Sequence, residues 1–475
     1  MQTILTEEWA TPVAVTSFGN GWAVALETYA ETGEVWTDLC HLQSGTASTC
    51  FTLPDSNLRV ISLSEFPGGD WICIAGTTYE VVDSLGLTAR VAVEARDASG
   101  TAWSGFGTDG RLDIEILSVY QELHGAHWDK ISGEDVLLLS GMSLDPCCIH
   151  QEVPFVAAVD LWGDPVAGFG HNGRIAIDLP NGGTYDEDQY RHDVGGVLYQ
   201  TRVSQDGHLF ACGAFSNTEH YEPLALQLNP DGTLDTAFAN GGAYHINASP
   251  GDQHWAMHAH EFPPNRWTLL IDHHADGNLE ASPQRLVLAS QGAEQFWNES
   301  SCLGADWMPV HAFSSDSIQF ALGSSASGNV FVQSWNASQN TSIDCSELWS
   351  EVTFGDDPVA SNDPISQKIA VATRGIPVAN NSIYSTLFHV FNQNINSNTS
   401  NGLKPTSRNC GNLTQKLTLW THLDPDVFDL CGRPVTNMFS QGHLTDIHIS
   451  RYERIKVHIV VFQDAGFACP ILVIN

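Results

Sequence analysis

Three stretches of the sequence repeat the same order of residues, and this repeat limits the fold more than any other feature. They read AVEARDASGTAWSGFGTDGRLDIEI from Ala92, AAVDLWGDPVAGFGHNGRIAIDL from Ala157 and LALQLNPDGTLDTAFANGGAYHINA from Leu224. In each stretch a phenylalanine is followed four residues later by a glycine; the pairs are Phe106 and Gly110, Phe169 and Gly173, and Phe238 and Gly242. We expect the phenylalanine to fill the space between neighbouring units and the glycine to allow a tight reversal of the chain.

The third stretch belongs to the clearest complete unit, which runs from Gly196 to Ala248. Turn residues divide four short apolar runs, which are Val197–Val203, His208–Gly213, Leu224–Leu228 and Ala243–Ile246. Asp206-Gly207 is a strong hairpin signal between the first two runs, and Asn229-Pro230-Asp231-Gly232 is a second turn. Four antiparallel strands in about 50 residues is the size of one propeller blade.

Runs that resemble the second strand of this unit recur along the chain. They are Gly21–Leu26, Asp70–Gly76, Asp135–Gly141, His208–Gly213, Trp267–Asp272, Ile318–Gly323, Lys368–Ala372 and Lys456–Phe462. The sequence therefore predicts an all-β fold: a single β-propeller domain over residues 1–475, made of four-stranded antiparallel blades. Eight blades are expected, and seven if the C-terminal region forms an appendage. Residues 1–8, which include the run Gln2–Leu5, would pair into the last blade and close the ring. Residues 9–356 hold the well-marked repeats and residues 357–475 the degenerate ones.

The repeat resembles a known family. Gln205–Gly213 and Leu228–Gly242 are similar to the delta-60 repeat, whose units run like "QPDGKIVVAG" and "LNPDGSLDTSFGTGG". The resemblance implies a β-propeller of the kind found in exported or surface proteins of bacteria.

The balance of charges bears on partners and location. The chain has 55 acidic and 19 basic residues, a formal net charge of −36, and such a field repels phosphate backbones and anionic membranes. We therefore expect a protein or a glycan as partner, and neither nucleic acid nor membrane insertion. Residues 1–13 show no signal peptide. The expected location is extracellular or surface-associated, with a virion protein as the alternative.

Cysteines and histidines supply the other candidate sites. Eleven cysteines leave at least one unpaired, and Cys40 with Cys50 and Cys410 with Cys431 are the candidate disulfides. Even spacing on a strand would place His254, His258 and His260 on one face, with His311 aligned one unit later. That cluster would hold a transition metal or simply pack between blades.

An acidic loop near the C-terminus is the second candidate metal site. Asp424, Asp426 and Asp429 would bind calcium or form a solvated loop, because the EF-hand spacing is missing. Beyond this possible calcium, no cofactor is expected.

No enzyme signature is present, so no catalytic residue is predicted from motifs. GxSxG, HExxH, the P-loop and the dinucleotide fingerprint are all missing. The leading hypothesis is a non-catalytic binding or structural module that presents loops to protein or glycan partners. The alternatives are a polysaccharide-acting hydrolase or lyase, with loop carboxylates such as Asp186, Glu187 and Asp188, and a virion or cell-appendage surface subunit.

Overall fold

A computed structural model describes most of the chain as short strands joined by turns. The residues described are 2–4, 10–29, 35–43, 49–82, 86–116, 120–144, 152–179, 195–217, 220–239, 241–245, 253–261, 264–274, 281–289, 292–298, 307–315, 318–325, 330–336, 341–349, 352–354, 359–363, 368–377, 385–392, 426–429, 457–461 and 472–474. Within these residues no helix has the length and apolar character needed to cross a membrane.

Six four-stranded antiparallel sheets follow one another along the chain, each with its strands in sequence order. The first sheet holds β2 (Ala10–Phe18), β3 (Gly21–Tyr29), β4 (Val35–Gln43) and β5 (Thr49–Thr52). The second holds β6 (Leu58–Glu65), β7 (Ile72–Val82), β8 (Gly86–Arg96) and β9 (Arg111–Ile114). The third holds β10 (Gln121–Ile131), β11 (Glu134–Leu144), β12 (Glu152–Val159) and β13 (Arg174–Ala176). The fourth holds β14 (Gly195–Val203), β15 (Leu209–Asn217), β16 (His220–Leu228) and β17 (Ala243–His245). The fifth holds β18 (Gln253–Glu261), β19 (Arg266–His274), β20 (Ala281–Ala289) and β21 (Gly292–Asn298). The sixth holds β22 (Trp307–Ser315), β23 (Ile318–Ser325), β24 (Val330–Asn336) and β25 (Thr341–Trp349).

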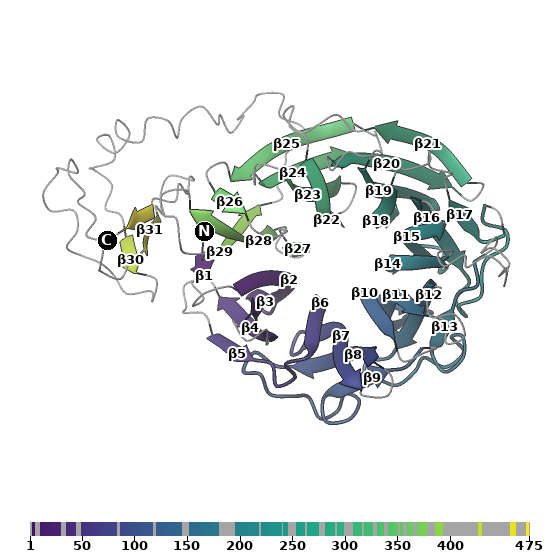
Figure 1. Cartoon of the computed structure of the whole chain (residues 1–475), viewed down its shortest axis with the longest axis horizontal. Coiled ribbons are helices and arrows are strands. Elements are labelled where there is room, and N and C mark those ends of the chain that lie inside the picture. Colours follow the sequence, from purple (N-terminus) through teal and green to yellow (C-terminus); the bar gives the residue numbers. More distant parts are fainter. Residues whose placement is uncertain are drawn as a thin grey trace, which may run out of the picture.

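Two further sheets complete the described part of the chain. A five-stranded sheet holds β1 (Gln2–Ile4), β26 (Val352–Phe354), β27 (Val359–Asp363), β28 (Lys368–Pro377) and β29 (Ser385–Asn392). A three-stranded sheet holds β30 (Asp426–Asp429), β31 (Val457–Val461) and β32 (Leu472–Ile474), and it lies to one side of the other sheets in Figure 1.

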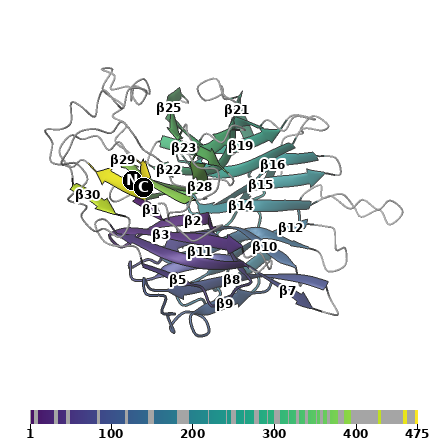
Figure 2. The ribbon, with the colours of Figure 1, turned by 60° about the vertical axis from the view of Figure 1, so that its left-hand side comes forward.

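The sheets other than the three-stranded one are arranged as blades around a common axis (Figure 1), and the second view shows their stacked strands (Figure 2). The inner strands β2, β6, β10, β14, β18 and β22 each contact the next in order, and β27 contacts both β22 and β2. The fold is therefore a β-propeller built of antiparallel, mostly four-stranded sheets.

Each of the eight strand runs expected from the sequence overlaps a strand. Seven of them lie on β3, β7, β11, β15, β19, β23 and β28, and the last lies on β31. The partner of the N-terminal strand differs from the expectation. β1 pairs with β29, with Thr3 opposite Leu387, and not with the described C-terminal strands β31 and β32.

The repeated phenylalanine and glycine do what the sequence predicts. Phe106, Phe169 and Phe238 are at most 1 % exposed, and each lies in a cluster that joins side chains of two successive sheets. Gly110, Gly173 and Gly242 have φ of +86°, +73° and +98°, a region that favours glycine. Each glycine N–H donates a hydrogen bond to the carbonyl of the phenylalanine four residues earlier, at 2.9–3.0 Å. The turn is therefore closed over a buried ring.

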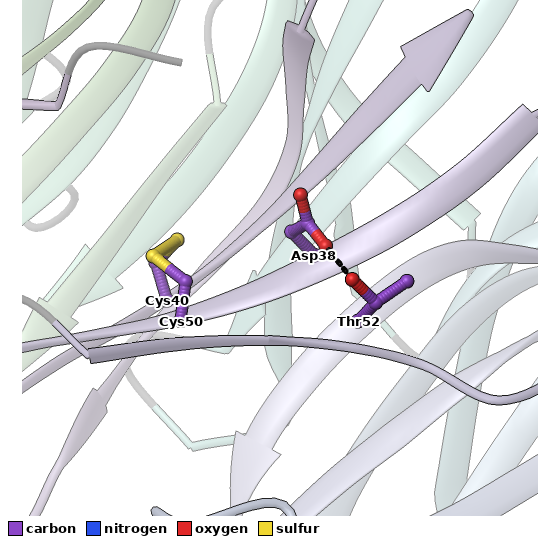
Figure 3. Close-up of a disulfide and its surroundings, with 4 residues drawn as sticks. All are labelled: Asp38, Cys40, Cys50 and Thr52. Carbon is purple, nitrogen blue, oxygen red and sulfur yellow. Dashed lines mark hydrogen bonds between the residues drawn. A yellow bond between two sulfur atoms is a disulfide. The ribbon is translucent and has the colours of Figure 1, made fainter. Parts of the chain in front are cut away.

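The first sheet carries a cross-strand disulfide. Cys40 on β4 lies opposite Cys50 on β5 and is bonded to it (Figure 3). Beside it, the Thr52 hydroxyl donates a 2.5 Å hydrogen bond to Asp38. β5 is the outermost strand of its sheet, so the bond holds an edge strand in place. Cys410 and Cys431 lie outside the described residues.

Removing this bond is expected to lower the free energy of unfolding by about 2–3 kcal/mol, the usual entropy of closing a loop of this length. We expect urea denaturation of Cys40→Ala/Cys50→Ala to show that loss. A reducing agent should destabilise the native chain by a similar amount and leave the double variant unchanged. Equal sensitivity of the two proteins to reduction would contradict this assignment.

Candidate functional site

Six inner strands carry a β-bulge at the same level. In each of these inner strands, the fourth or fifth residue has no partner in the next strand of the sheet, so the register shifts by one residue; we call it the skipped residue. The skipped residues are Val13, Ile61, His124, Tyr199, Met257 and Val310. Bulges of this kind re-aim a side chain and are common beside active sites. The skipped positions therefore recur near the same level of the inner strands, and in two neighbouring blades the skipped residues are His124 and Tyr199.

A glycine opposite the bulge makes room for it in several blades. An added Cβ at Gly76, Gly141 or Gly213 would lie 2.0, 2.0 or 1.9 Å from the carbonyl oxygen of Arg59, Glu122 or Val197. No real Cβ approaches a carbonyl so closely. The backbone at these glycines does not have a positive φ. Glycine is needed because the carbonyl group of the neighbouring strand comes too close for a side chain.

An acid–base cluster begins at the skipped residue of the third blade. Glu122 and His124 both lie on β10, with their carboxylate Oε2 and imidazole Nε2 3.9 Å apart. Tyr120 donates a 2.6 Å hydrogen bond to Glu122 Oε1, and Tyr79 from the second blade donates another of 3.0 Å. The side chains of Glu122 and His124 are 22 % and 28 % exposed, so both are accessible to a ligand.

Tyr199, skipped in the fourth blade, meets His124. Their rings are in edge contact, with centroids 5.5 Å apart. Burial lowers the pKa of His124, although the nearby Glu122 carboxylate acts in the opposite direction. Burial also raises the pKa of Tyr199, and Tyr221, Glu152 and Asp272 raise it further. At neutral pH the cluster therefore presents a neutral imidazole beside a protonated phenol.

Aromatic rings continue this cluster towards the fifth blade. Tyr221 contacts Trp255, with ring centroids 5.7 Å apart, and His254 stacks on His273 at 4.3 Å. Asp272 lies opposite Trp255 in the sheet and is buried. Flat apolar faces beside carboxylates suit a sugar, which has apolar C–H faces and many hydroxyl donors.

The structure corrects the expectation that the histidines of β18 share one face. His254 lies opposite His273, whereas His258 and His260 lie opposite Leu270 and Thr268. Residues 273 and 270 are three apart on one strand, so they point to opposite faces, and their partners do too. The bulge at Met257 supplies the extra residue that breaks the even spacing. His311 lies on β22 opposite Leu322, and its side chain is outside the described set.

The other expected metal site lies mostly beyond the described residues. Asp426 and Asp429 begin and end β30, and Asp424 is outside the described part, as are Asp186, Glu187 and Asp188. Among the side chains that are described, no group of three possible metal ligands comes together.

A half-buried pair of basic side chains, Arg202 and His127, holds β10 against β14. Arg202 of β14 hydrogen-bonds the ring of His127, and Asp129 accepts a 2.8 Å hydrogen bond from the Val203 N–H. Burial lowers the pKa of Arg202 to about 10 and, together with the guanidinium, holds the pKa of His127 well below its usual value. His127 therefore stays neutral as an acceptor.

Because of His127, we expect the free energy of unfolding to fall in acid. Because the folded pKa of His127 is depressed, the unfolded chain binds the extra proton once the pH falls below about 6.5. We expect the His127 contribution to the free energy of unfolding to fall by about 1.4 kcal/mol per pH unit below that value. Urea denaturation between pH 5 and 7 should show a shallower pH slope for His127→Gln than for the native chain, and identical slopes would contradict the assignment.

Comparison with known proteins gives distant likenesses of fold. No family model matches the chain and no curated protein does, so the delta-60 resemblance stays a prediction. Among solved structures, the β-propeller domain of the trilobed protease from Pyrococcus furiosus is 7 % identical, with 82 % of this chain and 96 % of that chain covered and a TM-score of 0.44. The periplasmic gluconolactonase of Pseudomonas aeruginosa is 12 % identical, covering 80 % and 95 %, with a TM-score of 0.37. Oligopeptidase B from Leishmania major is 9 % identical, covering 97 % and 54 %, with a TM-score of 0.39.

These likenesses run against one expectation from the sequence, the non-catalytic binding or structural module, because the named propellers belong to peptidases and a gluconolactonase. At 7–12 % identity they show the fold alone and assign no activity to this chain. Short sequence motifs do not reveal the Glu122–His124–Tyr199 cluster, because its residues come from different strands and blades. Only the hydrolase alternative is carried forward, and it depends on the geometry of the cluster.

Proposed function

We propose that the chain is a hydrolase that cleaves a glycosidic bond in a neutral polysaccharide at Glu122, His124 and Tyr199. One observation carries the proposal: two adjacent bulges bring a neutral imidazole into contact with a protonated phenol, with a carboxylate beside the imidazole. Hydrolysis requires a base that takes a proton from water and an acid that protonates the leaving oxygen, and these two groups supply them.

In the proposed reaction, His124 takes a proton from water as the water oxygen bonds to the anomeric carbon. The glycosidic C–O bond breaks, and its oxygen receives a proton from Tyr199. The proton on His124 then returns to Tyr199 through water. Glu122 stabilises the imidazolium during the reaction, and Glu152 and Asp272 stabilise positive charge on the sugar ring. Most glycosidases use two carboxylates instead.

The charge of the chain favours a neutral substrate. A net charge of −36 opposes the approach of polyuronates, which are the substrates of polysaccharide lyases. Tyr221 and Trp255 would stack on the uncharged faces of sugars. Hydrolysis of a neutral glycan therefore fits better than elimination from an acidic one.

The experiment is a turnover assay on the purified full chain. Amylose, galactomannan and xyloglucan are incubated with it, and new reducing ends are measured, with polygalacturonate as the acidic comparison. Release of reducing ends from a neutral polymer supports the proposal. Turnover of polygalacturonate to unsaturated products would replace hydrolysis by elimination, and no turnover of any polymer would overturn the proposal.

The number of blades and the closure of the ring are part of the same proposal. The support is the six four-stranded sheets with the five-stranded sheet, whose β27 contacts β2 and whose β29 pairs with β1. We infer seven blades, with the N-terminal strand as the outer strand of the seventh. The cross-strand disulfide supports a location outside the cell or on its surface, since such bonds persist in oxidising surroundings.

A further inference from the structure

A tryptophan is exposed at the opposite end of the strands from Glu122. Trp162 follows β12 in the turn Asp160–Gly163, and it is 56 % exposed. Among the described residues only Ile61 is a second exposed large hydrophobic side chain. A single exposed apolar side chain is ordinary on a protein surface, and Trp162 differs in the aromatic row that lies behind it.

Trp162 is one end of a row of three indoles. Its ring contacts Trp103 with centroids 5.7 Å apart, and Trp103 stacks on Trp71 at 5.4 Å. Phe66 packs edge-on against Trp103 at 5.5 Å and contacts Trp128 at 4.8 Å. The middle indole, Trp103, is thus packed between Trp71 and Phe66, and Trp162 presents its ring to solvent at the end of the row.

The backbone of Trp162 is held as firmly as its ring. Asp160 Oδ1 accepts hydrogen bonds from the N–H of Trp162 at 2.8 Å and of Asp164 at 2.9 Å. The Trp162 carbonyl accepts a 2.7 Å hydrogen bond from the Gly107 N–H of the preceding blade. A rigid indole loses little entropy when a ligand binds to it.

The same turn in the neighbouring repeats carries no aromatic residue. Asp231 takes the equivalent place in the fourth blade, where its carbonyl accepts a 2.7 Å hydrogen bond from the Gly170 N–H. In the second blade the place belongs to Ser99, whose N–H donates to Asp97 at 2.8 Å. The turn therefore folds with a small polar residue, and the indole of Trp162 is not needed to form it.

We propose that Trp162, with the row Trp103 and Trp71 behind it, binds a sugar ring of a neutral polysaccharide, at a site separate from the Glu122–His124–Tyr199 cluster. The indole face stacks on the C–H face of the sugar, and the exposed carboxylate of Asp164, in the same turn, accepts hydrogen bonds from its hydroxyls. The choice of a glycan rests on the proposed function. Polymer bound here raises the effective concentration of cleavable bonds at the cluster.

Binding is measured in the full chain with the His124→Gln change, so that polymer is not consumed. Affinity electrophoresis through gels with amylose, galactomannan or xyloglucan compares this parent with parent plus Trp162→Ser and parent plus Trp162→Tyr. We expect Trp162→Ser to weaken binding by about tenfold, equivalent to about 1.4 kcal/mol, and Trp162→Tyr to retain most of it. Equal mobility of the parent and its Trp162→Ser form in every polymer gel would overturn the inference. The serine is the residue that the second blade uses at this place, so unfolding is not expected, and equal urea midpoints of the two proteins check this.

Two further measurements separate this inference from the proposed function. With His124 intact, Trp162→Ser should cleave a short oligosaccharide at the native rate and the polymer more slowly. If the native chain cleaves no glycan but binding still depends on Trp162, the proposed function fails and this site remains. Binding of a lysine-rich and arginine-rich peptide that depends on Trp162, with no glycan bound, would show a cation–π surface for a basic partner and overturn the glycan site.

Discussion

Gly213→Ala is expected to cost about 3 kcal/mol or more of the free energy of unfolding, the range for overpacking against backbone that cannot yield. The new Cβ would lie 1.9 Å from the Val197 carbonyl oxygen and 2.8 Å from the Leu198 Cα. Relief requires the bulge at Tyr199 to close or the two strands to separate. Urea denaturation followed by tryptophan fluorescence measures the loss.

A glycine of the same blade supplies the matched control. Gly207 lies in the turn before β15 with φ of +90°, and an added Cβ there would meet nothing within 4 Å. Gly207→Ala should therefore cost only the backbone strain, about 1–2 kcal/mol. If Gly213→Ala costs no more than Gly207→Ala, the close approach at the bulge is wrong.

His124→Gln is expected to lower kcat/KM on a neutral polysaccharide by about 10²–10⁴-fold, the usual contribution of a general base. Because burial lowers the pKa of His124, the imidazole stays neutral and active below pH 6.5. In the native enzyme, kcat/KM should therefore stay level as the pH falls through 6.5 and decline only in stronger acid. A pH profile of the cleavage rate measures this.

Glu122→Gln tests the carboxylate separately. The Glu122 charge raises the pKa of His124, so its removal should move the acid limb of the profile to lower pH. Tyr120→Phe removes one of the two hydrogen bonds to Glu122 but keeps its charge. It should therefore leave the pH at which kcat/KM declines in acid close to that of the native enzyme. An acid limb that stays in place in Glu122→Gln, or full activity in His124→Gln, would contradict the assigned roles.

The repeating part of the fold could be predicted from sequence because its signals are local. Phe238 and Gly242 are four residues apart in one turn, and Asp206-Gly207 marks one hairpin, so neighbouring residues determine both features. The buried ring and the positive φ follow from that short stretch alone. Strand positions were predictable for the same reason.

The cluster could not be predicted in this way. The six skipped residues at the bulges are of five different types, so no residue marks a bulge in the sequence. Only the glycine opposite, as at Gly141, is visible there. Tyr79 and Glu122 meet across two blades although they are 43 residues apart. The extra residue at Met257 also broke the even spacing on which the histidine prediction relied. A one-residue change of register reverses a face, and the sequence pattern does not record it.

The proposed closure of the ring by the pairing of β1 with β29 is the central claim about the fold. The most direct measurement is a cysteine cross-link between Thr3→Cys and Leu387→Cys, which lie opposite each other in β1 and β29. We expect oxidation to form this bond in the folded chain, with the joined peptide found by mass spectrometry, and no bond between Thr3→Cys and Ile459→Cys of β31. A bond to position 459 in place of 387 would contradict the closure proposed here.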